Sequence, residues 1–165
     1  MFYRRNWIAG IVVVLGLVMF IPVAQAQRHT IEGISCHSNT NTTVQAIPGE
    51  IYIGTFEGKG IFRSTHESKY ADNNTYYQVG VTKGAGGKWS WTGYTKNQRT
   101  DGDIVIWEFS GDSVNGTTSK VIFGTGKYKG AKGEMTTKQI TAGKPVVEGT
   151  TQACQKAVGW IELVK

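Results

Sequence analysis

The strongest constraint on the fold of this chain is a succession of short β-prone runs separated by turn residues. No window of 12 or more residues carries an apolar stripe with the 3.6-residue period of a helix. The candidate strands are residues 30–36, 50–57, 60–64, 75–82, 88–94, 103–110, 120–124, 133–139, 145–151 and 157–164. Gly, Asn and Asp cluster between these runs, for example at residues 39–41 and 57–60, and favour tight reversals. Many short strands with frequent turns predict an all-β fold, either an antiparallel barrel or a β-sandwich.

The composition describes a folded chain of one domain. Its 165 residues fall within the roughly 100 to 200 residues of a typical domain. Glycine, at 22 residues, is about 13% of the chain against a usual ~7%, but no Gly-X-Y period is present, so a collagen-like chain is excluded. Only 3 residues are proline, and aromatic residues reach 11%, which argues against a disordered chain.

The N-terminal segment has the pattern of a signal peptide. Arg4 and Arg5 precede an apolar run at residues 8–23, and Ala24-Gln25-Ala26 then supplies a small-x-small cleavage pattern. We predict a signal peptide at residues 1–26, a single β-barrel domain at residues 27–165, and a periplasmic or secreted location. An uncleaved anchor is the alternative, but the apolar run is short for a membrane span of ~20 residues. No later run reaches that length, so no membrane span is expected after cleavage.

The two cysteines, Cys36 and Cys154, lie near opposite ends of the predicted mature chain. Disulfides persist in exported proteins, so we expect the two cysteines to bond to each other. Such a bond requires the first and last strands to lie side by side, which a closed barrel provides. Two unpaired thiols or a redox pair are the alternative, which the absence of a C-x-x-C spacing disfavours.

The candidate strand at residues 103–110 is apolar on both faces. Ile104 and Ile106 alternate with Val105, Trp107 and Phe109, so neither face reads as solvent-exposed. In a barrel one face is the lumen, and the other needs a second layer, such as a homo-oligomer interface or the N-terminal segment. The alternative is a central strand of a sandwich beneath a long loop.

A glycine-rich motif follows the apolar run at residues 120–124. A Gly-x-Gly after a strand can bind phosphate, but only if a helix follows, and residues 134–139 are instead β-prone. The glycines therefore predict a kink where neighbouring strands pass closely. The motif is Gly-Thr-Gly-x-Tyr-x-Gly-Ala-x-Gly and comprises Gly124, Thr125, Gly126, Tyr128, Gly130, Ala131 and Gly133.

This motif resembles the signature of the allene oxide cyclase and dirigent barrel-like superfamily, and residues 102–111 look like the strand that precedes it there. The resemblance implies an antiparallel eight-stranded barrel whose lumen holds one hydrophobic small molecule, often in a trimer. The uncharacterised bacterial exported branch of this superfamily fits the predicted signal peptide best. The motif is structural, so the resemblance implies a cavity without assigning an activity.

Four aromatic residues are candidates for ligand binding: Trp89, Trp91, Trp107 and Tyr128. Trp89 and Trp91 are two residues apart and share one face of a strand, where two indoles can stack on a ligand or fill a core. The other two are less specific, because a single aromatic residue usually packs in a core.

Charged residues on or beside the candidate strands are candidates for catalysis. Glu57, Arg63 and Glu108, together with His66, would acquire shifted pKa values if they faced a low-dielectric cavity. Strand carboxylates usually point to water, which is the alternative. His29 and His37 flank Cys36 without metal-ligand spacing, so neither a metal site nor a cofactor is expected.

Basic residues surround the tryptophan pair and the glycine motif. They are Lys83, Lys88, Lys96, Arg99, Lys120, Lys127, Lys129 and Lys132. Interleaved bases and aromatics can bind single-stranded nucleic acid, but export argues against that partner. The formal net charge is only +6, of which Arg4 and Arg5 contribute two, so we interpret these residues as a solvated surface.

The sequence thus leaves three functional hypotheses. The first is a non-enzymatic exported barrel that binds a small hydrophobic molecule in its lumen. The second is a dirigent-like or cyclase-like enzyme that steers a reactive intermediate with Arg63, Glu57 or Glu108. The third is a structural envelope module, which requires a filled barrel and an exposed apolar patch.

Overall fold

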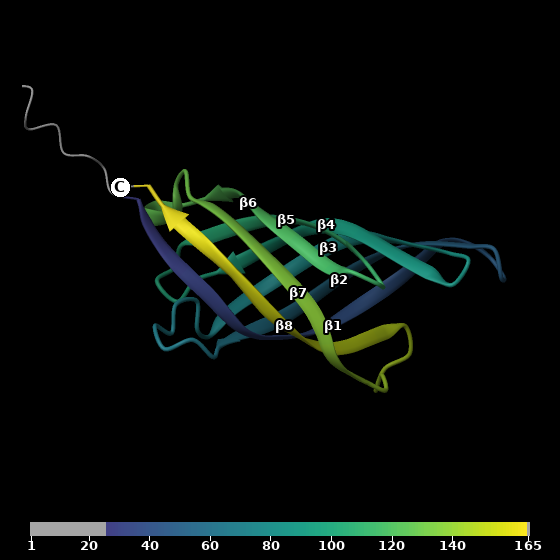
Figure 1. Cartoon of the computed structure of the whole chain (residues 1–165). Helices are drawn as coiled ribbons and strands as arrows, with labels where there is room; N and C mark the ends of the chain where they lie inside the picture. The colour runs from purple at the N-terminus through teal and green to yellow at the C-terminus, as the bar shows by residue number, and fades with distance from the viewer. Residues whose placement is uncertain (1–25, 165) are drawn as a thin grey trace, which may run out of the picture.

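The computed structural model describes residues 26–164, which form a closed antiparallel barrel (Figure 1). Its strands are β1 (Gln27–Ile47), β2 (Ile51–Ser64), β3 (Asn74–Ala85), β4 (Lys88–Gln98), β5 (Ile104–Asp112), β6 (Gly116–Gly124), β7 (Lys132–Gly143) and β8 (Thr150–Leu163). Each strand pairs with its neighbours in the chain, and β8 closes the ring on β1. The predicted antiparallel eight-stranded barrel is confirmed, and the β-sandwich alternative is wrong. The predicted signal peptide lies outside the described residues except for Ala26.

Two candidate strands, residues 50–57 and 60–64, are parts of one continuous strand, β2. The turn expected at residues 57–60 is therefore wrong. A Cβ at Gly60 would collide with the Tyr76 ring of β3 and with the carbonyl oxygen of Cys36. The glycine thus permits a close approach inside the sheet instead of a reversal.

The turn expected at residues 39–41 and the strand expected to begin at residue 145 are also wrong. Residues 39–41 lie within β1, where the Asn39 side chain turns inward and accepts a hydrogen bond from Gln78 Nε2 at 2.8 Å. Residues 144–149 form a loop, and β8 begins only at Thr150. Pro145 has no N–H to donate to a ladder, and Val146 is 86% exposed, so this apolar run cannot continue the sheet.

The seam between β1 and β8 carries the disulfide between Cys36 and Cys154, which pair directly across the two strands with a Cα–Cα distance of 4.0 Å. The predicted bond is confirmed. The rungs on either side of this pair, Ser35 with Gln155 and His37 with Ala153, line the lumen, so strand alternation places the disulfide on the outer face. It therefore ties the first strand to the last without occupying the interior.

The barrel has two unlike ends, which we call the base and the mouth. The base carries both chain ends of the described segment and the connections at residues 65–73, 99–103 and 125–131, near the label C in Figure 1. The mouth carries the connections at residues 48–50, 86–87, 113–115 and 144–149. The main cluster of buried apolar side chains lies toward the base and comprises Ile31, Phe62, Val105, Trp107, Tyr128, Ala157, Ile161 and Leu163.

Strand β5 shows how the sequence alternation maps onto the barrel. Val105, Trp107 and Phe109 are buried inside, whereas Ile104 and Ile106 are half-buried on the outer face. The inner apolar face of β5 therefore packs in the core, and its outer apolar face is only partly covered.

Candidate functional site

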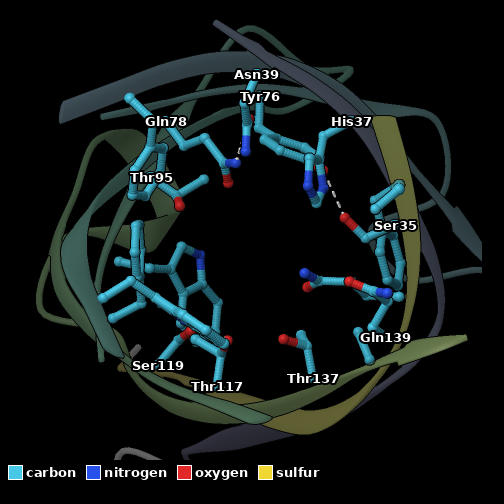
Figure 2. Close-up of a pocket in the computed structure, with 18 of the residues that line it drawn as sticks. Ser35, His37, Asn39, Tyr76, Gln78, Thr95, Thr117, Ser119, Thr137 and Gln139 are labelled. Atoms are coloured by element: carbon cyan, nitrogen blue, oxygen red, sulfur yellow. Dashed lines mark hydrogen bonds between the residues drawn. The ribbon is translucent and has the colours of Figure 1, made fainter. Parts of the chain in front are cut away.

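The interior of the barrel contains a cavity of about 480 Å³ that runs from Arg99 at the base to Asn41 and Pro145 at the mouth. Alternate residues of all the strands line it, because successive side chains of a strand point to opposite faces. The volume lies within the range of roughly 300 to 1,000 Å³ typical of small-molecule sites. Figure 2 shows lining side chains that point toward the open centre.

Polar but uncharged side chains dominate the part of the cavity above the base. The lining residues with an amide or hydroxyl group are Ser35, Asn39, Asn41, Asn74, Tyr76, Gln78, Thr82, Thr95, Asn97, Thr117, Ser119, Thr137, Gln139, Thr151, Gln152 and Gln155. Several of them are labelled in Figure 2. None of the lining residues is Asp or Glu. The lining therefore offers many neutral hydrogen-bond donors and acceptors and little charge.

Hydrogen bonds within the lining fix the direction of some of these groups. Ser35 Oγ and the Tyr76 hydroxyl lie 2.7 Å apart, and Gln78 Nε2 donates to Asn39 Oδ1 at 2.8 Å (Figure 2). These bonds use only part of the hydrogen-bonding capacity of each amide. The remaining donors and acceptors face the open lumen.

His37 also lines the cavity. Burial lowers the pKa of the His37 imidazole, because a low-dielectric site disfavours the charged form. At neutral pH the ring is therefore an uncharged donor and acceptor, in keeping with the amides around it. Within residues 26–164, no group of three or more His, Cys, Asp or Glu side chains is arranged to hold a metal ion.

The tryptophans singled out from the sequence all face the lumen. Trp89, Trp91 and Trp107 line the cavity, and the Trp91 indole N–H donates to Thr117 Oγ1 at 2.9 Å. Trp89 lies near the mouth and packs against Tyr52, with ring centroids 5.3 Å apart. Tyr128 does not line the cavity; it is 2% exposed and packs behind the base. The indoles form an aromatic wall beside the polar groups.

Arg99 was assigned to the solvated surface from the sequence, but the structure buries it at the base of the cavity with 8% exposure. Its guanidinium lies between the rings of Tyr70 and Tyr128, 4.7 and 4.8 Å from their centroids. Its Nε–H donates to the Tyr128 hydroxyl at 3.0 Å. Strand alternation predicts this inward position, because Arg99 continues the odd-numbered series of Trp91, Thr95 and Asn97, which also face the lumen.

The glycine motif builds the plug that closes the base. A Cβ at Gly124 would collide with the carbonyl oxygen of Tyr128, so the chain can fold back tightly only with glycine there. Thr125 Oγ1 accepts from the Ile104 N–H at 2.9 Å and donates to Asp103 Oδ1 at 3.2 Å. A short 3₁₀ turn, η1 (Gly126–Tyr128), then places the Tyr128 ring in the core. The motif shapes the wall behind the cavity and supplies the tyrosine that holds Arg99.

The remaining members of the motif complete the same connection. Gly126 and Gly130 have positive φ angles, Ala131 packs against the core cluster, and Gly133 passes close to Trp160 and Trp107. Every member of the motif thus acts on the backbone path or the packing of the base.

The charged candidates for catalysis lie on the outside of the barrel. Glu57 is exposed and accepts a hydrogen bond from the Tyr77 hydroxyl at 2.6 Å, and Arg63 pairs with Asp72 at 3.2 Å. Glu108 is exposed on the outer face of β5. His66 lies in the connection after β2 and contacts Ser68. The sequence could not fix the strand register, and the observed register turns these strand positions away from the cavity.

Comparison with known proteins identifies the architecture. No family model matches the sequence, and no curated protein matches it at a significant level. The barrel is similar to the solved structure of the pterocarpan synthase dirigent protein GePTS1, with a TM-score of 0.54 and 10% identity over 88% of this chain and 95% of that one. The chain has a dirigent-like barrel fold. A second pterocarpan synthase dirigent protein, PsPTS1, matches with a TM-score of 0.51 and 10% identity over 86% of this chain and 99% of that one.

The dirigent-like fold agrees with the resemblance in the glycine motif. At 10% identity the similarity concerns the fold alone, so the use of the dirigent-like lumen has to be argued from its own side chains. Among the described residues, no helix is long and apolar enough to cross a membrane.

Proposed function

We propose that this dirigent-like barrel is a non-enzymatic binding protein that holds one small amphipathic molecule in its lumen. The observation that carries the proposal is the cavity of about 480 Å³ with an aromatic wall and a neutral polar lining. Indole rings stack on flat or sugar-like rings, while amides and hydroxyls bond to hydroxyl and carbonyl groups. The ligand expected from the sequence was hydrophobic; the lining supports a molecule that also carries polar groups.

The two other hypotheses have less support. A steering enzyme built on Glu57, Arg63 and Glu108 does not fit, because these side chains lie outside the lumen. The dirigent-like enzyme remains the second candidate through the similarity to pterocarpan synthase dirigent proteins, and its titratable groups in the lumen would be His37, Tyr76 and Arg99. A purely structural envelope module would be filled with side chains, and this barrel has a cavity.

A titration with 2-naphthalenemethanol tests the proposal, because this probe has an aromatic ring, a hydroxyl group and no charge. We expect saturable binding to the folded protein with a dissociation constant on the order of 10 to 100 µM, as for other ligands of this size. Calorimetry or quenching of tryptophan fluorescence would measure it.

Two variants of β7 separate lumen binding from surface binding. Thr137→Trp places an indole in the cavity and should abolish binding, whereas Thr136→Trp places the same indole on the exposed outer face and should leave binding unchanged. Equal binding to both variants would show that the probe sits elsewhere. A wild-type protein that binds no probe would contradict the proposal.

We also propose that the barrel is exported and assembles with copies of itself. The disulfide is consistent with a periplasmic or extracellular location. The outer faces of β3 and β4 expose Tyr77, Val79, Val81 and Tyr94, which supports an interface on that wall. Mass spectrometry of the mature protein should place its first residue at Gln27, and light scattering should give an oligomer that Val79→Lys dissociates.

A further inference from the structure

The guanidinium of Arg99 is a buried charge at the closed end of a cavity. The side chain is 8% exposed and lines the lumen. Buried charges are normally paired, because removing an ion from water is costly. Its Nε–H donates to the Tyr128 hydroxyl at 3.0 Å, and the Tyr70 phenol is its other polar neighbour. Among residues 26–164, no carboxylate accepts a hydrogen bond from its two terminal nitrogens.

The carboxylates that lie nearby in the chain are engaged elsewhere. Asp101 pairs with Lys127 Nζ at 2.6 Å. Asp103 accepts hydrogen bonds from Thr125 Oγ1 at 3.2 Å and from the Lys127 backbone N–H at 3.3 Å. In the part of the chain that the structure describes, no carboxylate lies within 4.0 Å of the Arg99 guanidinium. The positive charge therefore lies against two tyrosines, and no carboxylate is in direct contact with it.

Two other polar atoms beside Arg99 also lack protein partners. The Tyr70 hydroxyl and His29 Nε2 are buried without a hydrogen bond in the described chain, and their rings stack with centroids 4.1 Å apart. Burial raises the pKa of the Tyr70 phenol. Burial, followed by the nearby Arg99 and Lys127, lowers the pKa of the His29 imidazole. Both groups are uncharged at neutral pH, so neither compensates the guanidinium.

Building on the proposed function, we propose that Arg99 binds the carboxylate of an organic acid whose ring lies in the lumen. A carboxylate matches the planar fork of a guanidinium, and charge-assisted hydrogen bonds are stronger than neutral ones. Phe62 and Trp107 line the cavity near Arg99, so an apolar ring can follow the anionic group toward the mouth. No lining Asp or Glu repels an acid, which makes Arg99 the charged group that selects the ligand.

The test compares 2-naphthoic acid with 2-naphthalenemethanol, which share the ring and differ in charge. At pH 7.5 the wild-type protein should bind the acid about tenfold more tightly than the alcohol, as expected for one charge-assisted contact in a dry site. Arg99→Gln should remove this preference while changing the affinity for the alcohol by less than about threefold. Arg99→Lys retains the charge and should retain part of the preference.

Arg63→Gln is the matched control, because Arg63 lies on the outer face and should leave both affinities unchanged. Equal affinities of the wild-type protein for acid and alcohol would overturn the role of Arg99 while leaving the proposed function intact, and this comparison needs no variant to fold. Failure of both probes to bind the wild-type protein would overturn the proposed function and the Arg99 site together.

Discussion

At the base of the barrel the inward side chains pack against one another, whereas toward the mouth they surround open space. Along β8, Ile161 is fully buried in the core, while Gln155 and Thr151 line the cavity. The base is closed by the glycine motif and by Arg99 between two tyrosines. One ring of strands thus has two unlike halves, a packed base and an open upper lumen, and the proposed binding belongs to the open half.

The largest loss of stability should come from removing the disulfide that joins the first strand to the last. Replacing Cys36 and Cys154 with serine removes a cross-link between residues 118 apart. The loop-entropy model gives a loss of about 4 to 5 kcal/mol in the free energy of unfolding. Urea denaturation of the double variant and the wild type would measure it, and an unchanged midpoint would show that the sheet alone closes the ring.

The next effect directly compares base and mouth within one strand. Ile161→Ala leaves a cavity in the packed base and should cost about 2 to 5 kcal/mol in the free energy of unfolding. Gln155→Ala removes a side chain that already borders open space, so it should cost less than about 1 kcal/mol. Comparable losses in the two variants would contradict the division into a packed base and an open lumen.

A smaller effect is expected in the connection at the base. Asp103→Asn weakens the hydrogen bonds from Thr125 Oγ1 and from the Lys127 N–H, with an expected loss of about 1 to 2 kcal/mol. Asp112→Asn is the control at the mouth, where Asp112 accepts bonds from Val114 and Asn115 in an exposed hairpin and should matter less. Thermal unfolding of both variants measures the difference, and a larger loss for Asp112→Asn would reverse the comparison.

The smallest effect is a pH dependence that arises from two histidines. Burial lowers the pKa of both His37 in the lumen and His29 at the base below the unfolded value of 6.5. Below pH 6.5 the unfolded chain therefore binds more protons than the folded one, so stability falls as the pH drops. The aspartates with lowered pKa values act only below about pH 4, outside this range.

Urea midpoints at pH 7.5 and pH 5.0 isolate this contribution. The wild type should be less stable at pH 5.0 than at pH 7.5, because burial disfavours the charged His37 ring. In His37→Gln no ring has to be kept uncharged at this position, so the difference in stability between the two pH values should be smaller. His29→Gln gives the matching measurement at the base. If stability were the same at both pH values, neither imidazole would be held neutral by the fold.

The fold could be predicted largely because its strongest signals are local. Frequent turns gave the all-β class, and the two cysteines gave the closure of the first strand on the last. The glycines at residues 57–60 predict a turn but lie inside β2, because the sequence does not distinguish a glycine that permits a turn from one that lets a tyrosine ring approach the backbone. Pro145 was the signal that the candidate strand at residues 145–151 does not begin at its first residue, and β8 begins only at Thr150.

The site was less predictable because it depends on register. Trp89 and Trp91 were expected to share one face of a strand, because alternation relates neighbours within a strand, and both line the cavity. Which face of each strand points inward depends on how the strands pair around the ring, which the sequence does not show. In the observed pairing Glu57 lies outside and Arg99 lies inside. The predicted strand ended at residue 94, so the alternation that places Arg99 on the same face as Trp91 was not followed far enough to include it.

The central claim, that the lumen binds a small molecule, is tested most directly by following the indole N–H signals in NMR spectra during a titration with 2-naphthalenemethanol. Trp160 is the internal control, because it lies on the outer face of β8 beneath the Arg28 guanidinium, 4.1 Å from its ring centroid. We predict that the signals of Trp89, Trp91 and Trp107 shift with one saturation curve while the Trp160 signal stays fixed. A shift of Trp160 alone, or of none of the four, would contradict the account.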